Sequence, residues 1–226
     1  MEQLVFELSA PSAPRLSNFV PGRNAELVAA LMRFVAGGQN ETGMMIWGEP
    51  ASGKTHLLNA AIALAQERGV TARMFGDPEA IEERDIDAPD ELVAIDRIDD
   101  ARPIAAGRIF TLYNALKSRR ARLLAASRTP LATLRLREDV RTRLAAGLVY
   151  EIVALADHEK SAALEGYAKQ RGFALSSEVI DYLLRHGRRD MGSLLAALSA
   201  LDRLSLAGKR PVTVPLLREW LQGELD

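Results

Sequence analysis

Hydrophobic positions recur along the first two thirds of the chain in two alternating patterns. Short apolar runs predict buried strands at 44–48, 71–75, 91–96, 121–127 and 148–153. Between them, apolar positions at helical spacing predict helices at 25–36, with Asn24 as the N-cap, at 56–69 and at 104–119. Strands that alternate with helices are typical of a parallel sheet covered on both faces. We therefore expect an α/β core.

From residue 157 onward the strand pattern stops and only helical periodicity remains. It predicts helices at about 158–171, 176–187 and 190–207, and a last one after Pro215. The sequence therefore indicates an α/β domain over 15–156 and a small, all-helical C-terminal lid over 157–226, with a hinge near 155–157. Residues 1–14 contain two prolines and no sustained period, so we expect a flexible tail.

The composition narrows the class of protein. Of the 226 residues, 48% are hydrophobic and 26% are charged, the balance of a soluble globular protein. The absence of cysteine excludes disulfides and thiolate metal sites and favours a reducing cytoplasm. No run of about 18 apolar residues predicts a membrane span. Because 29 basic residues nearly cancel 30 acidic ones, no overall positive field would hold the chain on DNA, and we expect any DNA contact to be made through a partner.

A phosphate-binding loop is the most specific motif. The sequence GEPASGKT fits the pattern G-x-x-x-x-G-K-[ST] and lies between a predicted strand and a predicted helix. Its backbone N–H groups and the helix N-terminus would surround the phosphates of ADP or ATP. Lys54 would reach the terminal phosphates, and Thr55 would place a hydroxyl on Mg²⁺. The expected nucleotide-binding residues are Gly48, Glu49, Pro50, Ala51, Ser52, Gly53, Lys54 and Thr55.

An acid at the end of a neighbouring buried strand is the second part of such a site, and Asp96 fits it as a magnesium ligand. Many P-loop hydrolases have a second acid directly after the first, but here Arg97 follows. We therefore expect weak hydrolysis by the chain alone. Asp99 and Asp100 are either compensating carboxylates or solvated loop acids, and the pattern favours the second interpretation.

These motifs resemble the AAA+ module of the DnaA family over nearly the whole chain. The segments concerned are LSNFVPGRN, GEPASGKT, LVAIDRIDD, LLAASRTP, VRTRLAAGLVYEI and RRDMGSLLAALSALDR, in family order. Within the family the chain is most similar to the Hda group of regulatory inactivators, since it ends after the lid and lacks the helix-turn-helix module that follows it in DnaA. The resemblance implies an AAA+ P-loop core with a helical lid.

The resemblance also implies nucleotide contacts outside the loop. Phe19, Val20 and Asn24 would lie beside the adenine, with an ordinary helix entry as the alternative interpretation. His56, directly after Thr55, is included among the nucleotide-binding residues.

Three further residues match phosphate-sensing positions of the family. Ser127 would be a polar sensor of the γ-phosphate, and Arg189 a second sensor that folds over the phosphates from the lid. Arg143 matches the arginine that the family presents to a nucleotide on the neighbouring subunit. A solvated basic helix face is the rival interpretation, because other arginines lie nearby. These are Arg135, Arg137 and Arg141.

The N-terminal segment QLVFEL looks like the short peptide by which the Hda group binds the sliding clamp. Gln3 would enter a polar slot, and an apolar pocket would take Leu4, Phe6 and Leu8. A plain disordered tail is the alternative.

Together these features predict a DnaA-related regulator bound to the sliding clamp, the beta subunit of DNA polymerase III, and through it to DNA. It would stimulate hydrolysis of ATP bound to DnaA and so repress re-initiation of replication, in the cytoplasm and with a homodimer possible. One alternative is a self-sufficient DnaA-like ATPase that loads a helicase or remodels DNA. Another is a P-loop kinase of small molecules, which would need an acceptor pocket and no arginine acting on a neighbour.

Overall fold

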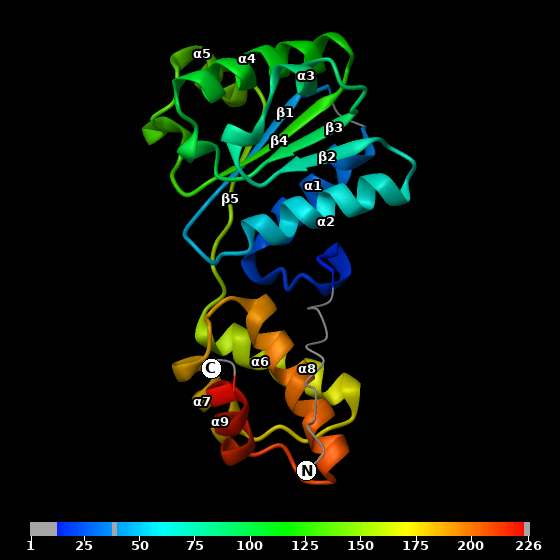
Figure 1. Cartoon of the computed structure of the whole chain (residues 1–226), viewed down its shortest axis with the longest axis vertical. Helices are drawn as coiled ribbons and strands as arrows, with labels where there is room; N and C mark the ends of the chain where they lie inside the picture. The colour runs from blue at the N-terminus through cyan, green and yellow to red at the C-terminus, as the bar shows by residue number, and fades with distance from the viewer. Residues whose placement is uncertain (1–12, 38–39, 224–226) are drawn as a thin grey trace. The chain divides into compact units, whose positions relative to one another are not determined.

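The computed structural model describes residues 13–37 and 40–223, and the strands within them form one five-stranded sheet (Figure 1). The strands are β1 (Gly43–Trp47), β2 (Ala72–Phe75), β3 (Leu92–Ile95), β4 (Arg122–Ser127) and β5 (Leu148–Glu151). Their spatial order is β2-β3-β4-β1-β5, and every neighbouring pair is parallel. The predicted parallel sheet is confirmed. Because parallel strands end at one edge, the residues after β1, β3 and β4 lie side by side there.

Helices cover both faces of this sheet (Figure 1). On one face lie α1 (Ala25–Ala36) and α2 (Lys54–Glu67). On the other lie α3 (Glu83–Ile86), α4 (Pro103–Ser118) and α5 (Glu138–Ala145). Side chains of β1 alternate between the two cores: Met44 and Ile46 pack with α1 and α2, whereas Met45 packs with α4. This period of two explains why the strands are apolar throughout.

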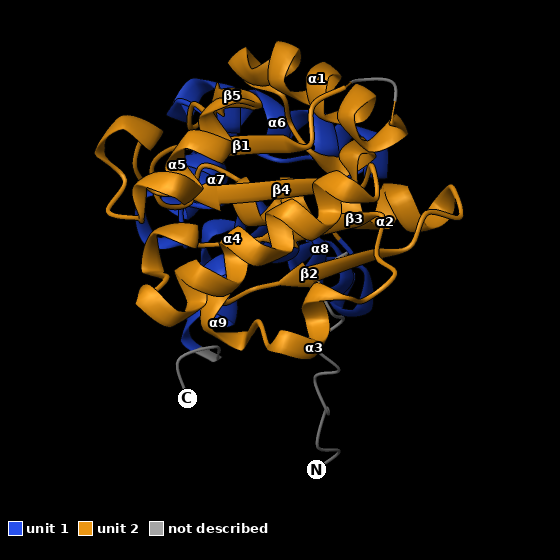
Figure 2. Ribbon diagram, turned by 90° about the horizontal axis from the view of Figure 1, so that it is seen from above, with its two compact units in different colours: residues 1–13, 155–226 blue, residues 14–154 orange. Residues whose placement is uncertain are grey.

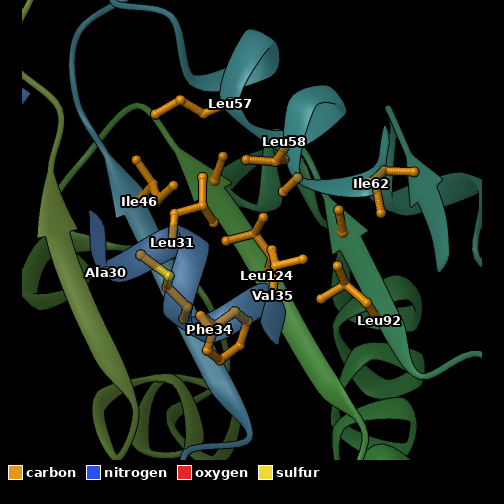
Figure 3. Close-up of a cluster of buried hydrophobic side chains, with 14 of the residues drawn as sticks. Ala30, Leu31, Phe34, Val35, Ile46, Leu57, Leu58, Ile62, Leu92 and Leu124 are labelled. Carbon is orange, nitrogen blue, oxygen red and sulfur yellow. The ribbon is translucent and has the colours of Figure 1, made fainter. Parts of the chain in front are cut away.

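The larger core is built from fully buried aliphatic and aromatic side chains (Figure 3). Phe34 and Leu31 of α1 meet Ile46 of β1, and Leu58 of α2 closes the same cluster. Each of these side chains has 0% exposure, so its burial contributes roughly 1.5–3 kcal/mol to folding. The labelled members from the sheet and both helices are Ala30, Leu31, Phe34, Val35, Ile46, Leu57, Leu58, Ile62, Leu92 and Leu124.

A half-buried arginine donates to two C-terminal carbonyls of α1. Arg122 Nη1 donates to Phe34 O and to Val35 O, both at 2.6 Å. The helix then ends at Gly37, whose φ of 77° is in the left-handed region that glycine adopts readily. Burial lowers the pKa of Arg122, and the charge of Glu91 opposes this shift. The guanidinium therefore caps a helix end that would otherwise be unsatisfied inside the protein.

Two helices were absent from the sequence prediction. The segment 76–90, for which the sequence analysis predicted no helix, contains the single helical turn of α3. The helix α5 lies where only a basic segment was noticed, because Val140 and Leu144 are its two buried residues. One apolar contact per turn gives too weak a periodicity to predict a helix.

Residues 14–154 form one compact unit, and residue 155 begins a second one (Figure 2). The second unit contains α6 (Asp157–Arg171), α7 (Ser177–His186), α8 (Met191–Gly208) and α9 (Val214–Gly223), which confirms the predicted helical lid. Capping explains two of the starts: Ser176 Oγ accepts from Val179 N, and Asp190 Oδ1 accepts from Ser193 N at 2.8 Å. Within residues 13–37 and 40–223, no helix combines the length and apolar character needed to cross a membrane.

Close packing at the start of β5 makes a stability prediction. A Cβ on Gly147 would lie 2.1 Å from the backbone oxygen of Gly43, and neither backbone can retreat without disturbing the sheet. We expect Gly147→Ala to lower the free energy of unfolding by about 1–3 kcal/mol. The matched control is Gly107→Ala in α4, where the new Cβ would lie 3.4 Å from the end of the Arg137 side chain. For this control we expect the free energy of unfolding to rise by about 0.5–1 kcal/mol, because alanine favours the helix. Urea unfolding measures both; equal stability of the two variants would contradict the packing.

Candidate functional site

The loop between β1 and α2 has the geometry that the motif predicts. It begins with Gly48 N donating to Ser127 O at 3.2 Å, which ties the loop to the end of β4. Inside the loop, Ala51 and Gly53 have φ values of 61° and 104°. Left-handed residues inside a loop turn successive N–H groups toward a common centre, which is an anion-binding arrangement. The loop then passes directly into the N-terminus of α2 at Lys54.

Packing explains why two loop positions are glycine. A Cβ on Gly48 would lie 2.4 Å from the carbonyl oxygen of Ile152, just after β5. A Cβ on Gly53 would lie 3.0 Å from Cε2 of Phe19. The loop is therefore pressed between the chain that leaves the sheet and the segment before α1, and these neighbours fix its course.

Lys54 is a buried cation whose hydrogen bonds all go to neutral groups. Its Nζ donates to Gly48 O at 2.7 Å, to Glu49 O at 2.6 Å and to Ser52 Oγ at 3.3 Å. Only 8% of the residue is exposed, and no carboxylate of the described part of the chain forms an ion pair with it. Burial lowers the pKa of Lys54, although Asp96 and Asp99 act in the opposite direction. A buried ammonium without a counter-ion fits an anionic ligand such as a phosphate chain.

Thr55 and Asp96 meet beside this lysine. Thr55 Oγ1 donates to Asp96 Oδ2 at 2.5 Å, and Asp96 Oδ1 accepts from Arg97 N at 2.8 Å. A hydroxyl and a carboxylate side by side are oxygen donors of the kind that Mg²⁺ prefers. No group of three His, Cys, Asp or Glu residues that could hold a metal occurs in residues 13–37 and 40–223. The pair therefore fits a magnesium ion whose other ligands are phosphate oxygens and water.

The side chain of Arg97, the residue after Asp96, is hydrogen-bonded to the backbone that follows β2. Arg97 adopts a left-handed backbone conformation with φ of 50°, and its Nε and Nη2 donate to Gly76 O at 3.0 and 2.6 Å. The guanidinium is thus held by the backbone that follows β2.

Sequence reasoning missed a residue that controls the nearby acids. Arg128 follows Ser127 at the end of β4, and its Nε donates to Asp99 Oδ2 at 2.5 Å while Nη2 donates to Asp100. The Asp99 side chain is only 10% exposed, so the interpretation as a solvated loop acid is wrong for Asp99, whereas Asp100 is exposed. The hydrogen bond to Asp99 raises the pKa of Arg128. The signal available in the sequence was an arginine directly after a buried strand that ends at the predicted phosphate loop.

Ser127 lies at the predicted edge of the sheet, but its hydroxyl has a local partner. The residue is 1% exposed, and its Oγ donates to Thr129 O at 2.5 Å. Its carbonyl accepts from Gly48, so Ser127 supports the phosphate loop through its backbone.

The residues predicted beside the adenine divide into two groups. Phe19 contacts the end of the loop and lies 5.6 Å from the His56 ring, measured between centroids. Val20 is half-buried in the same segment. Asn24 instead pairs with the backbone: its Nδ2 donates to Val153 O and its Oδ1 accepts from Val153 N, both at 2.8 Å. Asn24 is the N-cap residue of α1, as predicted, but its side chain makes no capping hydrogen bond to the helix.

The four arginines near α5 differ in their surroundings. Arg137 pairs with Asp139 at 2.7 Å, Arg135 is exposed, and Arg141 has no polar partner among the described residues. Arg143 alone is held by neutral groups: its Nε donates to Asn114 Oδ1 at 2.9 Å and its Nη1 to Asp139 O at 3.1 Å. Its guanidinium carbon also lies 3.9 Å from the centroid of the Phe110 ring. A uniformly solvated basic face does not describe this arrangement.

In the lid, Arg189 lies before α8 and pairs with Asp157, the first residue of α6. The Nη2 to Oδ2 distance is 3.1 Å, and the two side chains are 67% and 58% exposed. Such an exposed pair contributes little to stability, so Arg189 can exchange this partner at small cost. The predicted clamp-binding residues, Gln3, Leu4, Phe6 and Leu8, lie outside the described residues.

Comparison with known proteins identifies relatives of both units. Residues 157–221 match the family described as Hda, lid domain. Domain III of the Thermotoga maritima replication initiation protein DnaA is 16% identical, with a TM-score of 0.73 over 92% of this chain and 95% of that one. AMPPCP-bound DnaA from Aquifex aeolicus is 21% identical, with a TM-score of 0.70 over 85% of this chain and 65% of that one. Thermotoga maritima RuvB, a Holliday junction branch migration motor, is 14% identical, with a TM-score of 0.66 over 92% of this chain and 71% of that one. These structures confirm the predicted AAA+ fold.

The Asn24 pairing can be tested through stability. Asn24→Asp keeps the shape of the side chain but replaces the donor to Val153 O with an oxygen, so two acceptors face each other in a site that is 4% exposed. We expect a loss of about 1–3 kcal/mol in the free energy of unfolding at neutral pH, and partial recovery as acid protonates the carboxyl group. Asn59→Asp on α2 is the control, because Asn59 is bonded only within its own helix. Equal losses at both positions would refute the assigned role.

Proposed function

We propose that the chain, whose residues 157–221 match the Hda lid family and whose fold is similar to that of DnaA, is a clamp-bound regulator that promotes hydrolysis of the ATP held by DnaA. The segment Gln3 to Leu8 would bind the sliding clamp of DNA polymerase III and so bring the protein to replicating DNA. DnaA left with ADP would no longer open the origin, and re-initiation would be repressed.

A bound nucleotide of the chain's own is part of this proposal, and the observation that supports it is the uncompensated charge of Lys54. The ammonium is buried against neutral oxygens at a loop that contains two left-handed residues and leads into the N-terminus of α2. Lys54 and the loop would hold the phosphates of ADP or ATP, and Thr55 with Asp96 would hold Mg²⁺. When bound, the nucleotide supplies the negative charge that this site lacks. Phe19 and His56 would then flank it at the loop's end.

The hydrogen bonds of the carboxylates around this site support the proposal that the chain hydrolyses ATP only weakly. Arg97 occupies the position directly after Asp96, and it is bonded to Gly76 O. Asp99 and Asp100, the next acids in the sequence, both accept from Arg128. A carboxylate whose oxygens already accept hydrogen bonds from a guanidinium is a poor base, because its lone pairs are occupied. The chain would therefore retain a nucleotide as a structural element rather than turn it over.

Arg143 would act on the nucleotide of the partner. An arginine that approaches the phosphates from a neighbouring subunit raises hydrolysis rates by about 10³–10⁵ in P-loop enzymes. Arg143 is suited to this task because its partners are neutral and leave its charge uncompensated. Arg189 would close the lid over the chain's own nucleotide by exchanging Asp157 for phosphate, with the hinge at 155–157. Self-association through the same surfaces is part of the proposal.

The proposal differs measurably from its rivals. A helicase loader or DNA remodeller would hydrolyse ATP rapidly on its own and bind helicase rather than clamp. A small-molecule kinase would need no arginine directed at another subunit. None of the contacts around Lys54, Asp96 or Arg143 favours either of these functions.

Mixing the chain with DNA-loaded clamp and ATP-bound DnaA tests the proposed function. We expect hydrolysis of the DnaA-bound ATP to accelerate, and Arg143→Ala to reduce that acceleration by about 10³-fold, because the transition-state charge loses its guanidinium. Gln3→Ala should abolish the effect at low protein concentration by weakening clamp binding. Arg135→Ala, which removes an exposed neighbouring charge, is the control and should act like the unmodified chain. An unmodified chain that leaves DnaA-bound ATP intact, or an Arg143→Ala variant with full activity, would overturn the proposal.

A further inference from the structure

Arg143 lies in a cradle formed by two residues of α4 that are one helical turn apart. Phe110 presents its ring to the guanidinium, whose carbon lies 3.9 Å from the ring centroid. Asn114 accepts from Nε at 2.9 Å, and the carbonyl of Asp139 accepts from Nη1 at 3.1 Å. The stacked ring fixes the plane of the guanidinium, and the two acceptors fix its rotation within that plane.

The cradle holds the arginine without neutralising it. An aromatic face, an amide oxygen and a backbone carbonyl carry no formal charge, whereas a carboxylate would compete with any phosphate. Among the described residues, Nη2 of Arg143 has no partner.

Arg137 shows the opposite arrangement around the same ring. Its guanidinium carbon is 5.7 Å from the centroid of Phe110, but it pairs with the Asp139 carboxylate at 2.7 and 3.2 Å. The hydrogen bond from Arg137 lowers the pKa of Asp139, as does the bond from Val140 N. The Asp139 carboxylate is thereby hydrogen-bonded to Arg137 and not to Arg143, although the charge of Arg143 also lowers the pKa of Asp139.

We propose that Phe110 and Asn114 are positioning residues that set the direction of Arg143 toward ATP bound by the neighbouring subunit. This inference rests on the proposed function, since it needs a phosphate chain opposite Arg143. A free arginine side chain loses much rotamer entropy when it is fixed in a transition state. The cradle restricts the Arg143 side chain before the partner binds. It therefore affects the rate of ATP hydrolysis within the assembled complex more than the formation of that complex.

The test compares Asn114→Ala, Asn114→Asp and Phe110→Leu with the full-length chain, DNA-loaded clamp and ATP-bound DnaA. We expect the maximal hydrolysis rate at saturating protein to fall by about 10- to 100-fold in Asn114→Ala and Phe110→Leu, because a misdirected arginine loses alignment. The concentration for half-maximal effect should change little. Asn114→Asp should fall further than Asn114→Ala, because its carboxylate neutralises Arg143. Thr111→Ala on the exposed face of α4 is the matched control and should match the unmodified chain.

A second measurement separates this inference from the proposed function. In NMR spectra of the nitrogen-labelled free chain, the Nε–Hε signal of Arg143 should be slow to exchange with water, and Asn114→Ala should make it fast. If the Nε–Hε proton of Arg143 exchanges with water equally fast in both proteins, the proposed positioning role is overturned. A folded Asn114→Ala variant with the full maximal hydrolysis rate would overturn it as well. If the unmodified chain fails to accelerate hydrolysis while the exchange difference is present, the proposed function fails and the positioning role fails with it, although the geometry stands.

Discussion

A buried ammonium without a counter-ion is the constraint around which the α/β unit is organised. The parallel strands end at one edge, and the loop after β1 folds back there so that its own carbonyls solvate Lys54. Glycine is required where the loop touches Ile152 and Phe19, so the neighbours of the loop are as constrained as the loop itself. The arrangement costs free energy in the absence of an anion, since burial alone lowers the pKa of the lysine. A destabilising buried charge of this kind is typical of functional sites, where a bound ligand of opposite charge offsets the cost.

The distribution of guanidinium groups gives the site its proposed division of labour. Arg97 and Arg128 are bonded inward, to a backbone carbonyl and to two carboxylates, and they occupy the groups that a self-sufficient hydrolase would leave free. Arg143 lies on α5 and is held by neutral groups that leave its charge uncompensated. In the proposed function, arginine side chains would limit the chain's own hydrolysis at Arg97 and Arg128 and would assist hydrolysis by a partner at Arg143. This view explains why a protein with an intact phosphate loop would act mainly as an activator.

The sequence predicted the parts of the structure that depend on local patterns. Strands that are apolar on both faces, the glycine-rich loop and the four lid helices all have strong periodic or motif signals, and the structure confirms the strands and the lid. The contacts it could not predict join residues far apart in sequence: Asn24 with Val153, Arg128 with Asp99, and Arg143 with Asn114. In each case a polar side chain chooses a partner that only the tertiary fold brings near. Helix α5 was missed for a related reason, since its few apolar contacts are made by tertiary packing rather than by a repeated pattern.

Calorimetry of ADP and ATP binding to the purified chain, with and without Lys54→Met, tests the central claim most directly. The account predicts one site per chain in the unmodified protein and none in the variant, which should fold at least as stably because methionine buries no charge. Above neutral pH, where the phosphates are fully ionised, binding should raise the depressed pKa of Lys54 and take up a proton, so the affinity should fall as the pH rises through the pKa of the free state. Unmodified protein that binds neither nucleotide, or a Lys54→Met variant that binds both equally well, would contradict the account.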